Sequence, residues 1–337
     1  MKLSFTLILT SILLTGVLTA TAQTQTKHPG IELFEKGKYA EAVKSLETAV
    51  KEDALKTDAQ LWNFLGLSYI ERGEPKKAIK SLEKANDLNK EKIAYKVNLA
   101  YAYLRNRQLN KAQAKSEEVL LIEPKNTHAL YLHGIANLSE RKTDAARADA
   151  DKLIAADPTY VDAYILKADA IMLDATGPVI KPDEEPELGV ALKKAVDVLK
   201  QGIIACGKKP EVEKIKQDLE SKSAFLAYYE RKGSFKLNPG GIPPVKEEGV
   251  TPLKLMSKPR ASYTDAARQN GTQGSIQLAI LFGASGRIEY ILRLNSLGNG
   301  LDESAIKAAK GIKFVPQTKD GKPVSIVKVV QYGFSIY

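Results

Sequence analysis

The sequence predicts an α+β multidomain protein, in which an all-α solenoid is followed by a small α+β domain with a three-stranded antiparallel sheet. Two observations support this fold class. Small residues recur every 34 positions in the first part of the chain, as expected where paired helices cross closely in each unit of a repeat array. Beyond residue 250 the apolar residues alternate along short segments, which is the period of β-strands.

The chain opens with the pattern of a secretory signal peptide. Lys2 precedes an apolar run over residues 3–18, and the small residues Ala20 and Ala22 suit cleavage after Ala22. The run is about 16 residues long, shorter than the ~20 apolar residues that a membrane-spanning helix needs. We therefore expect residues 1–22 to be a cleaved signal peptide and the mature protein to be exported. An uncleaved membrane anchor is the alternative.

Residues 28–231 are expected to form the repeat domain. Its small residues stand in two registers, Gly66, Ala100, Gly134 and Ala168 in one, and Ala78, Ala112 and Ala146 in the other. The second unit also carries Trp62, Leu65 and Tyr69 on its first helix. This pattern resembles the tetratricopeptide repeat family.

A stacked array of this kind presents a concave surface that suits peptides and partner proteins. Residues of the first helices tend to line it. The candidates that lie beside the packing positions are Asn63, Tyr95, Asn98, Tyr131 and Asn137. The asparagine amides offer paired donors and acceptors to a peptide backbone. The alternative is that these side chains satisfy neighbouring backbone groups or face solvent.

The fifth unit is interrupted at residues 174–187, where three prolines and several acidic residues predict an inserted loop. These acids lack the ligand spacing and turn glycine of a calcium loop. Two more helices are predicted, over 188–204 and 211–231, and the second would cap the apolar end of the array through Ile215, Leu219 and Leu226. Residues 232–249 contain paired prolines and several glycines, as a linker does.

The last segment, 250–337, is expected to be a separate domain. A short helix is predicted after Thr264, a plausible N-cap. Two alternating strands follow, over 275–282 and 288–294, joined by the turn GASG. A helix over 301–313 and a final strand over 324–337 complete the predicted domain.

These pieces, in this order, resemble the C-terminal domain of the TonB family of periplasmic energy transducers. The matching segments are KPRASYTDAARQNGTQG, the hairpin around GASGRI, the helix LDESAIKAAKGIKFVP, and DGKPV before the last strand. The chain departs from the family at Thr264, where a proline is common, and at Ile312, where an aromatic residue is common. We read these departures as marks of a divergent member.

The resemblance implies that a short extended segment of an outer-membrane transporter pairs with the last strand of the domain. An exposed strand edge supplies main-chain donors and acceptors for such an addition. Arg268 stands where a family member uses a glutamine to meet that segment, and Lys328 is expected to protect the edge from promiscuous pairing. Val330→Pro is expected to remove a ladder donor, so loss of binding in this variant would support strand addition. The predicted strand-edge residues are Val324, Ile326, Lys328, Val330, Tyr332 and Phe334. Plain sheet formation, or a homodimer through this strand, is the alternative.

We find no catalytic pattern in the sequence. Its three histidines, His28, His128 and His133, lack ligand or nucleophile spacing, and Cys206 has no partner for a disulfide. No phosphate-binding loop and no nucleophile elbow occur. We predict no catalytic, metal or cofactor site. The net charge of +10 would favour nucleic acid in a cytosolic protein, which export argues against.

The sequence therefore predicts a non-enzymatic periplasmic adaptor of a Gram-negative cell envelope. Its repeats would bind a protein or peptide, and its terminal domain would pair with a transporter or another envelope protein. The alternative is a membrane-anchored energy transducer in which residues 3–18 remain in the inner membrane. That alternative has weaker support, because the family's anchor carries a functional histidine and is followed by a proline-rich spacer, and neither is found here.

Overall fold

The computed structural model describes residues 27–175, 185–232 and 248–335. The predicted signal peptide, most of the inserted loop and most of the linker lie outside these ranges. The chain divides into two compact units, the first ending at Leu88 and the second beginning at Asn89. In the described ranges, no helix combines the length and the apolar character needed to cross a bilayer.

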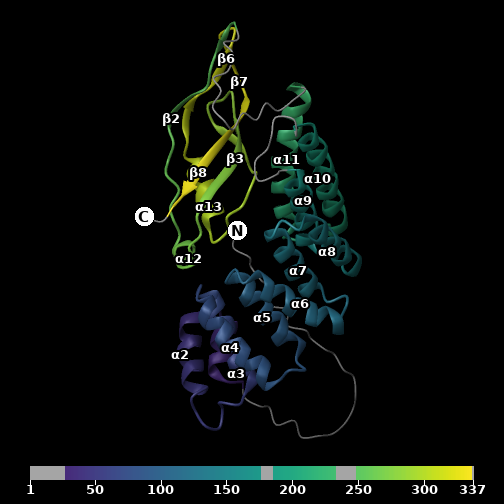
Figure 1. Cartoon of the computed structure of the whole chain (residues 1–337), viewed down its shortest axis with the longest axis vertical. Coiled ribbons are helices and arrows are strands. Elements are labelled where there is room, and N and C mark those ends of the chain that lie inside the picture. The colour runs from purple at the N-terminus through teal and green to yellow at the C-terminus, as the bar shows by residue number, and fades with distance from the viewer. Residues whose placement is uncertain (1–26, 176–184, 233–247, 336–337) are drawn as a thin grey trace. The chain divides into compact units, whose positions relative to one another are not determined.

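The first unit is helical (Figure 1). Asp58, whose backbone is extended, is the N-cap of the third helix. Its carboxylate accepts hydrogen bonds from the amides of Gln60 and Leu61, which satisfies donors that a helix start leaves unpaired. The helices are α1 (Pro29–Glu35), α2 (Tyr39–Ala49), α3 (Ala59–Glu71) and α4 (Pro75–Leu88).

Helices α3 and α4 pack closely because Gly66 has no side chain. A Cβ atom on Gly66 would lie 2.5 Å from Cγ of Leu82, which is nearer than packed carbon atoms approach. Leu82 and Ala78 are fully buried between the helices. Phe34 packs edge-on against Phe64, with 5.3 Å between the ring centroids. The 34-residue register of small residues is thus the register of helix crossings.

The second unit begins with helices as well. Asn126 caps one of its helices by accepting a hydrogen bond from the amide of Ala129 at 3.0 Å. The helices are α5 (Ile93–Arg105), α6 (Leu109–Ile122), α7 (Thr127–Ser139), α8 (Thr143–Ala156), α9 (Val161–Ala175), α10 (Glu185–Cys206) and α11 (Val212–Lys232). The last two correspond to the helices predicted over 188–204 and 211–231, each with boundaries shifted by one to three residues.

The turn inside each repeat uses one left-handed residue at the same register position. Gly73, Arg107 and Arg141 have φ angles of 75°, 60° and 60°, and they are 34 residues apart. Glycine adopts this conformation easily and arginine does not. Both arginines use the turn to reach a distant carbonyl: Arg141 donates to Leu173 O at 3.0 Å and Arg107 to Leu297 O at 2.8 Å.

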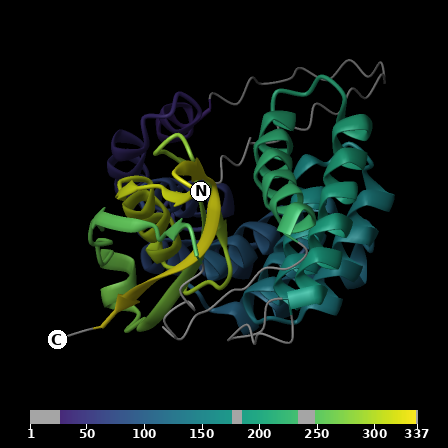
Figure 2. The ribbon, with the colours of Figure 1, turned by 90° about the horizontal axis from the view of Figure 1, so that it is seen from above.

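Helices α9, α10 and α11 lie side by side at the end of the array (Figures 1 and 2). They share a core in which Leu192, Leu199, Ile215 and Phe225 are fully buried. The predicted capping residues Leu219 and Leu226 pack against the same core and are partly buried. Helix α11 therefore packs against the apolar end of the helices before it, as predicted.

The C-terminal part of the second unit is an α+β domain with small antiparallel sheets. Its main sheet has the strand order β4–β3–β8 and is the predicted three-stranded sheet. The short pairs β2–β5 and β1–β6–β7 were not predicted. The elements are β1 (Val250–Thr251), β2 (Lys254–Ser257), α12 (Asp265–Gln269), β3 (Gly274–Phe282), β4 (Ile288–Arg293), α13 (Leu301–Lys310), β5 (Lys313–Val315), β6 (Gln317–Lys319), β7 (Lys322–Val324) and β8 (Ile326–Phe334).

Two predicted boundaries in this domain are wrong. The helix predicted to reach residue 313 ends at Lys310, because Gly311 forms its C-cap and Lys313 already pairs with Ser257 in a strand. The final strand predicted from residue 324 is divided at Ser325, whose hydroxyl accepts a hydrogen bond from the amide of Ala284 at 3.0 Å. Val324 therefore belongs to β7, where it pairs with Gln317.

The main sheet is buried on both faces, although the alternation over 275–282 predicted one buried face. Ile276, Leu278, Ile280 and Phe282 pack against α13. Ala279 and Leu281 point to the other face and are 2% and 3% exposed, in the core that contains α11. The continuous apolar run over 278–282 is the sequence signal of a strand buried on both sides.

Candidate functional site

The free edge of β8 is the first candidate site. β8 lies at the end of the sheet order β4–β3–β8 and pairs with β3 from Phe282↔Ile326 to Gly274↔Phe334 (Figure 1). No other strand in the described ranges pairs with it. An edge of this kind carries main-chain groups that can accept another strand.

Hydrogen bonds on β3 show which main-chain groups of β8 point away from the sheet. Gln277 accepts from the amide of Leu294 at 2.9 Å and donates its own amide to Asn295 Oδ1 at 2.6 Å. Both groups of Gln277 therefore face β4, so the pair Gln277↔Gln331 is not hydrogen-bonded. The amide and carbonyl of Gln331 then point outward. By alternation, the outward row is Val327, Val329, Gln331 and Gly333.

Two side chains already occupy parts of this outward row. Lys258 Nζ donates to the carbonyl of Gln331 at 2.7 Å, and the same ammonium lies 4.8 Å from the ring centroid of Tyr332. Burial raises the pKa of Tyr228 on α11, and a hydrogen bond from the backbone of Val327 opposes that rise. The outward groups of Val329 lie between these two contacts, and those of Gly333 lie beyond the contact at Gln331.

The side chains predicted for the strand edge mostly face the core of the domain. Ile326, Val330, Tyr332 and Phe334 are all 8% exposed or less, while Lys328 is exposed. Val324 lies on β7. Arg268, on α12, pairs with Asp265 at 2.7 Å and stacks 5.8 Å from the ring of Tyr263. A partner at this edge would meet the main chain of the intervening residues. Sequence reasoning did not identify Lys258 or Gln331, because their contact spans 73 residues and leaves no periodic signal.

The five residues predicted for the concave surface lie on the first helices of their repeats, α3, α5 and α7. Four of them are buried: Asn63, Tyr95, Tyr131 and Asn137 are at most 9% exposed. Tyr131 packs against Tyr160, with 5.8 Å between ring centroids, and burial raises its pKa well above the usual value. Asn98 is partly exposed. It is the most exposed residue of this group.

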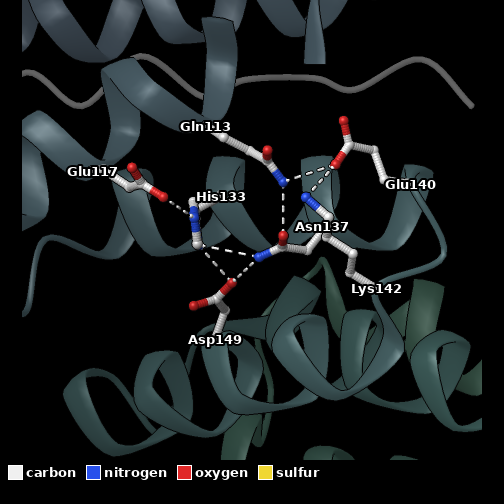
Figure 3. Close-up of polar contacts among 7 residues, drawn as sticks. All are labelled: Gln113, Glu117, His133, Asn137, Glu140, Lys142 and Asp149. Carbon is white, nitrogen blue, oxygen red and sulfur yellow. Dashed lines mark hydrogen bonds and ion pairs between the residues drawn. The ribbon is translucent and has the colours of Figure 1, made fainter. Parts of the chain in front are cut away.

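Asn137 belongs to a set of polar residues on α6, α7 and α8, here called the polar cluster (Figure 3). Its amide nitrogen donates to Asp149 Oδ2 at 2.8 Å, and its amide oxygen accepts from Gln113 Nε2 at 2.7 Å. The two ends of the amide are thus both used inside the repeat. The members of the polar cluster are Gln113, Glu117, His133, Asn137, Glu140, Lys142 and Asp149.

His133 links two helices within the polar cluster. Its Nδ1 lies 2.7 Å from Asp149 Oδ2 and its Nε2 lies 3.3 Å from Glu117 Oε1 (Figure 3). The hydrogen bond to Asp149 raises the pKa of His133, and burial opposes it only in part. Leu65 and Leu99 hold the corresponding register position in earlier repeats. At this register position His133 therefore makes hydrogen bonds where a leucine makes apolar contacts. No hydroxyl or thiol nucleophile is among the seven residues of the polar cluster.

The polar cluster does not gather metal ligands. In the described ranges, no group of three His, Cys, Asp or Glu side chains is placed to hold a metal ion. Cys206 is a buried free thiol, and burial is the main cause that raises its pKa. A thiol in that environment is a poor nucleophile.

Comparison with known proteins identifies the two halves separately. Residues 30–89 and 97–161 match the tetratricopeptide repeat model, and residues 259–336 match the model described as the Gram-negative bacterial TonB protein C-terminal. Both families consist of interaction domains, and both assignments agree with the resemblances seen in the sequence.

Solved structures similar to this chain cover about half of it. A MamA protein is 21% identical over 55% of this chain and 91% of its own, with a TM-score of 0.43. A MamA from Desulfovibrio magneticus RS-1 is 16% identical over 51% of this chain and 91% of its own, at 0.42. YrrB, described as a repeat protein with an unusual peptide-binding site, is 18% identical over 52% and 86%, at 0.41. No curated protein matches the chain.

Proposed function

We propose that this chain, which joins tetratricopeptide repeats to a TonB-type C-terminal domain, is a non-enzymatic adaptor of the cell envelope. Its terminal domain pairs by strand addition with an extended segment of an outer-membrane transporter or another envelope protein. Its repeats hold a second protein or peptide. The observation that carries the proposal is the outward row on β8, where Val329, Gln331 and Gly333 direct main-chain groups away from β3.

Main-chain pairing gives affinity with little demand on the partner's side chains. Each hydrogen bond added at the edge stabilises the complex by only about 0.5–1.5 kcal/mol net, so several successive residues of the partner must pair. Over Val329, Gln331 and Gly333 the outward row presents alternating main-chain donors and acceptors, which is the arrangement that an added strand needs, and in this stretch Lys258 occupies the carbonyl of Gln331.

The experiment that tests strand addition uses a proline on the outward row. In Gln331→Pro the outward amide is lost, while the β3 ladder keeps its bonds, since proline is tolerated at sheet edges where no ladder donor is required. We expect the full chain with Gln331→Pro to lose envelope proteins that the wild type retains after detergent extraction. Gln331→Ala is the matched control and should retain them. Retention by both variants would contradict strand addition.

The repeats are proposed to bind their partner through the first helices, around the partly exposed Asn98. The buried residues Tyr95, Tyr131 and Asn137, which lie in the same unit as Asn98, would support that surface from beneath. Asn98→Ala should weaken the capture of one set of proteins without affecting those lost in Gln331→Pro. Loss of the same set in both variants would mean that the two regions share one partner.

We place the protein in the periplasm because of the predicted signal peptide. Residues 3–18 retained as an anchor would instead favour a membrane-anchored energy transducer, as in the TonB family. Sequencing the N-terminus of the native protein separates the two. A start at Gln23 with recovery in the periplasmic fraction supports the adaptor, and an intact Met1 in the inner membrane supports the transducer.

A further inference from the structure

We propose that Lys258 is a removable cap on the free edge of β8, and that the cap admits an extended segment carrying a carboxylate. The inference deepens the proposed function and rests on it for the identity of the site. Lys258 closes the edge in the absence of a partner, and a strand that carries a carboxylate opens it.

The position of Lys258 is fixed by the domain itself. It follows β2, whose Ser257 pairs with Lys313 on β5. Pro259, on its other side, packs at Gly311, where an added Cβ would meet the proline ring at 3.1 Å. The backbone of Lys258 is therefore held in place beside β8. Only its side chain, which ends on Gln331 O, is free to swing away.

The bond from Lys258 blocks a central position of the outward row. Gln331 lies between Val329 and Gly333, so an added strand that pairs along β8 must place an amide against the carbonyl of Gln331. The Lys258 ammonium occupies this carbonyl at 2.7 Å and is held over the face of Tyr332. An incoming strand has to displace the ammonium before the row is open from Val329 to Gly333.

Lys328 was the residue expected to protect this edge, and its position does not suit that role. It pairs across from Ile280 on β3, so its amide and carbonyl belong to the inward row. Its side chain is exposed, and it makes neither of the two contacts to the outward row. Lys258, which follows β2, contacts an outward carbonyl directly.

Charge determines which strand can open the cap. Among the described residues, no carboxylate pairs with Lys258, so displacement leaves its ammonium without an anionic partner in the domain. Residues 248–335 contain twelve Lys and Arg residues and six Asp and Glu residues. A strand with a carboxylate near Gln331 would bind the displaced ammonium, whereas a basic strand would meet Lys258 and the exposed Lys328 as like charges.

The first test needs no partner. Lys258→Met keeps the length and the apolar stem of the side chain but removes the donor, so the outward row becomes open from Val329 to Gly333 and two copies of the full chain can pair edge to edge along it. We expect sedimentation equilibrium to show a dimer dissociation constant lowered about tenfold or more. Lys328→Met is the control and should behave as the wild type. Association of Lys328→Met, or none in Lys258→Met, would overturn the cap.

The second test measures selection with two synthetic peptides, Thr-Val-Thr-Val-Glu-Val-Thr-Val-Thr and the same peptide with Lys at its centre. The wild type should bind the Glu peptide about tenfold more tightly than the Lys peptide, and Lys258→Met should lose that preference. An equal affinity in the wild type, or a preference that survives in Lys258→Met, would overturn the selection. If neither peptide binds any variant, strand addition fails, while the self-association result still decides the cap.

Discussion

The polar cluster of the repeats and the free edge of β8 handle polar groups in opposite ways. In the cluster, both ends of the Asn137 amide and both ring nitrogens of His133 have partners within three neighbouring helices. At the edge, the outward main-chain groups of β8 meet two isolated contacts among the described residues, one from Lys258 and one from Tyr228. The side chains of the polar cluster already bond to one another, whereas outward main-chain groups of β8 can still form hydrogen bonds with an added strand.

This difference explains why residue type alone misleads. Asn137 has the chemistry of a peptide-binding residue, but burial and three polar neighbours commit it to the repeat. Gln331 has an ordinary exposed side chain, and its contribution comes from its backbone. The site depends on which polar groups are left without permanent partners, because those groups gain most from binding.

Val330→Pro and Gln331→Pro should separate the inward and outward rows most clearly. Val330 points its amide toward Leu278 on β3, so proline there should cost about 3 kcal/mol or more, since a buried acceptor is left unpaired and the ring strains the ladder. Gln331→Pro should change stability by only about 0.5 kcal/mol. Hydrogen exchange of the β3 amides, measured by mass spectrometry, checks this difference. Tryptophan fluorescence would not serve, because Trp62 lies in the first unit and does not report on the sheet. Equal protection in the two variants would mean that the rows are assigned the wrong way round.

Asp149→Ala should be the most damaging change within the polar cluster. It leaves Asn137 and His133 without their shared acceptor, at a cost of about 1–3 kcal/mol. Asp151 on the same helix is exposed and pairs with Lys167 at 2.6 Å, so Asp151→Ala is the control and should cost less than about 1 kcal/mol. Urea denaturation of the full chain followed by circular dichroism measures both. Similar midpoints for the two variants would show that the cluster does not stabilise the fold.

The stability of the cluster should depend on pH through His133. Because the hydrogen bond to Asp149 raises the pKa of His133, the pair stabilises the fold fully below the unfolded pKa of about 6.5. That contribution is lost as the pH rises through the higher pKa of the folded state. The wild type should therefore lose stability relative to His133→Gln as the pH rises from about 6.5 through the raised pKa of folded His133. His128, whose pKa burial lowers, is common to both proteins. If the difference in stability between the wild type and His133→Gln stayed constant with pH, the His133–Asp149 pair would not be the cause.

Tyr332→Phe should have the smallest effect. The Tyr332 hydroxyl is buried and has no hydrogen-bond partner in the described part of the chain, so its removal discards a polar group that gains nothing from folding. We expect the melting temperature to be unchanged or slightly raised. Tyr263→Phe, which removes a hydroxyl bonded to Thr272 O, is the comparison and should lower it. A clear loss in Tyr332→Phe would reveal a partner for this hydroxyl.

The sequence predicted the elements whose signals are local. The 34-residue register located the helix crossings at Gly66 and Ala78, and the alternation over 275–282 located β3. The divided final strand was missed because its break depends on Ser325 meeting Ala284, 41 residues away. The second buried face of β3 was missed because alternation describes one strand and does not reveal what lies above the sheet.

By itself, the sequence determined the two domain types, the phase of the repeats and the strands of the terminal sheet, because periodicity is a property of neighbouring residues. Only the tertiary structure decided that Asn137 is enclosed, that Val330 faces inward while Gln331 faces outward, and that Lys258 closes the edge. Each of these depends on which distant main-chain or side-chain group lies within hydrogen-bonding distance, and that is set by packing between elements.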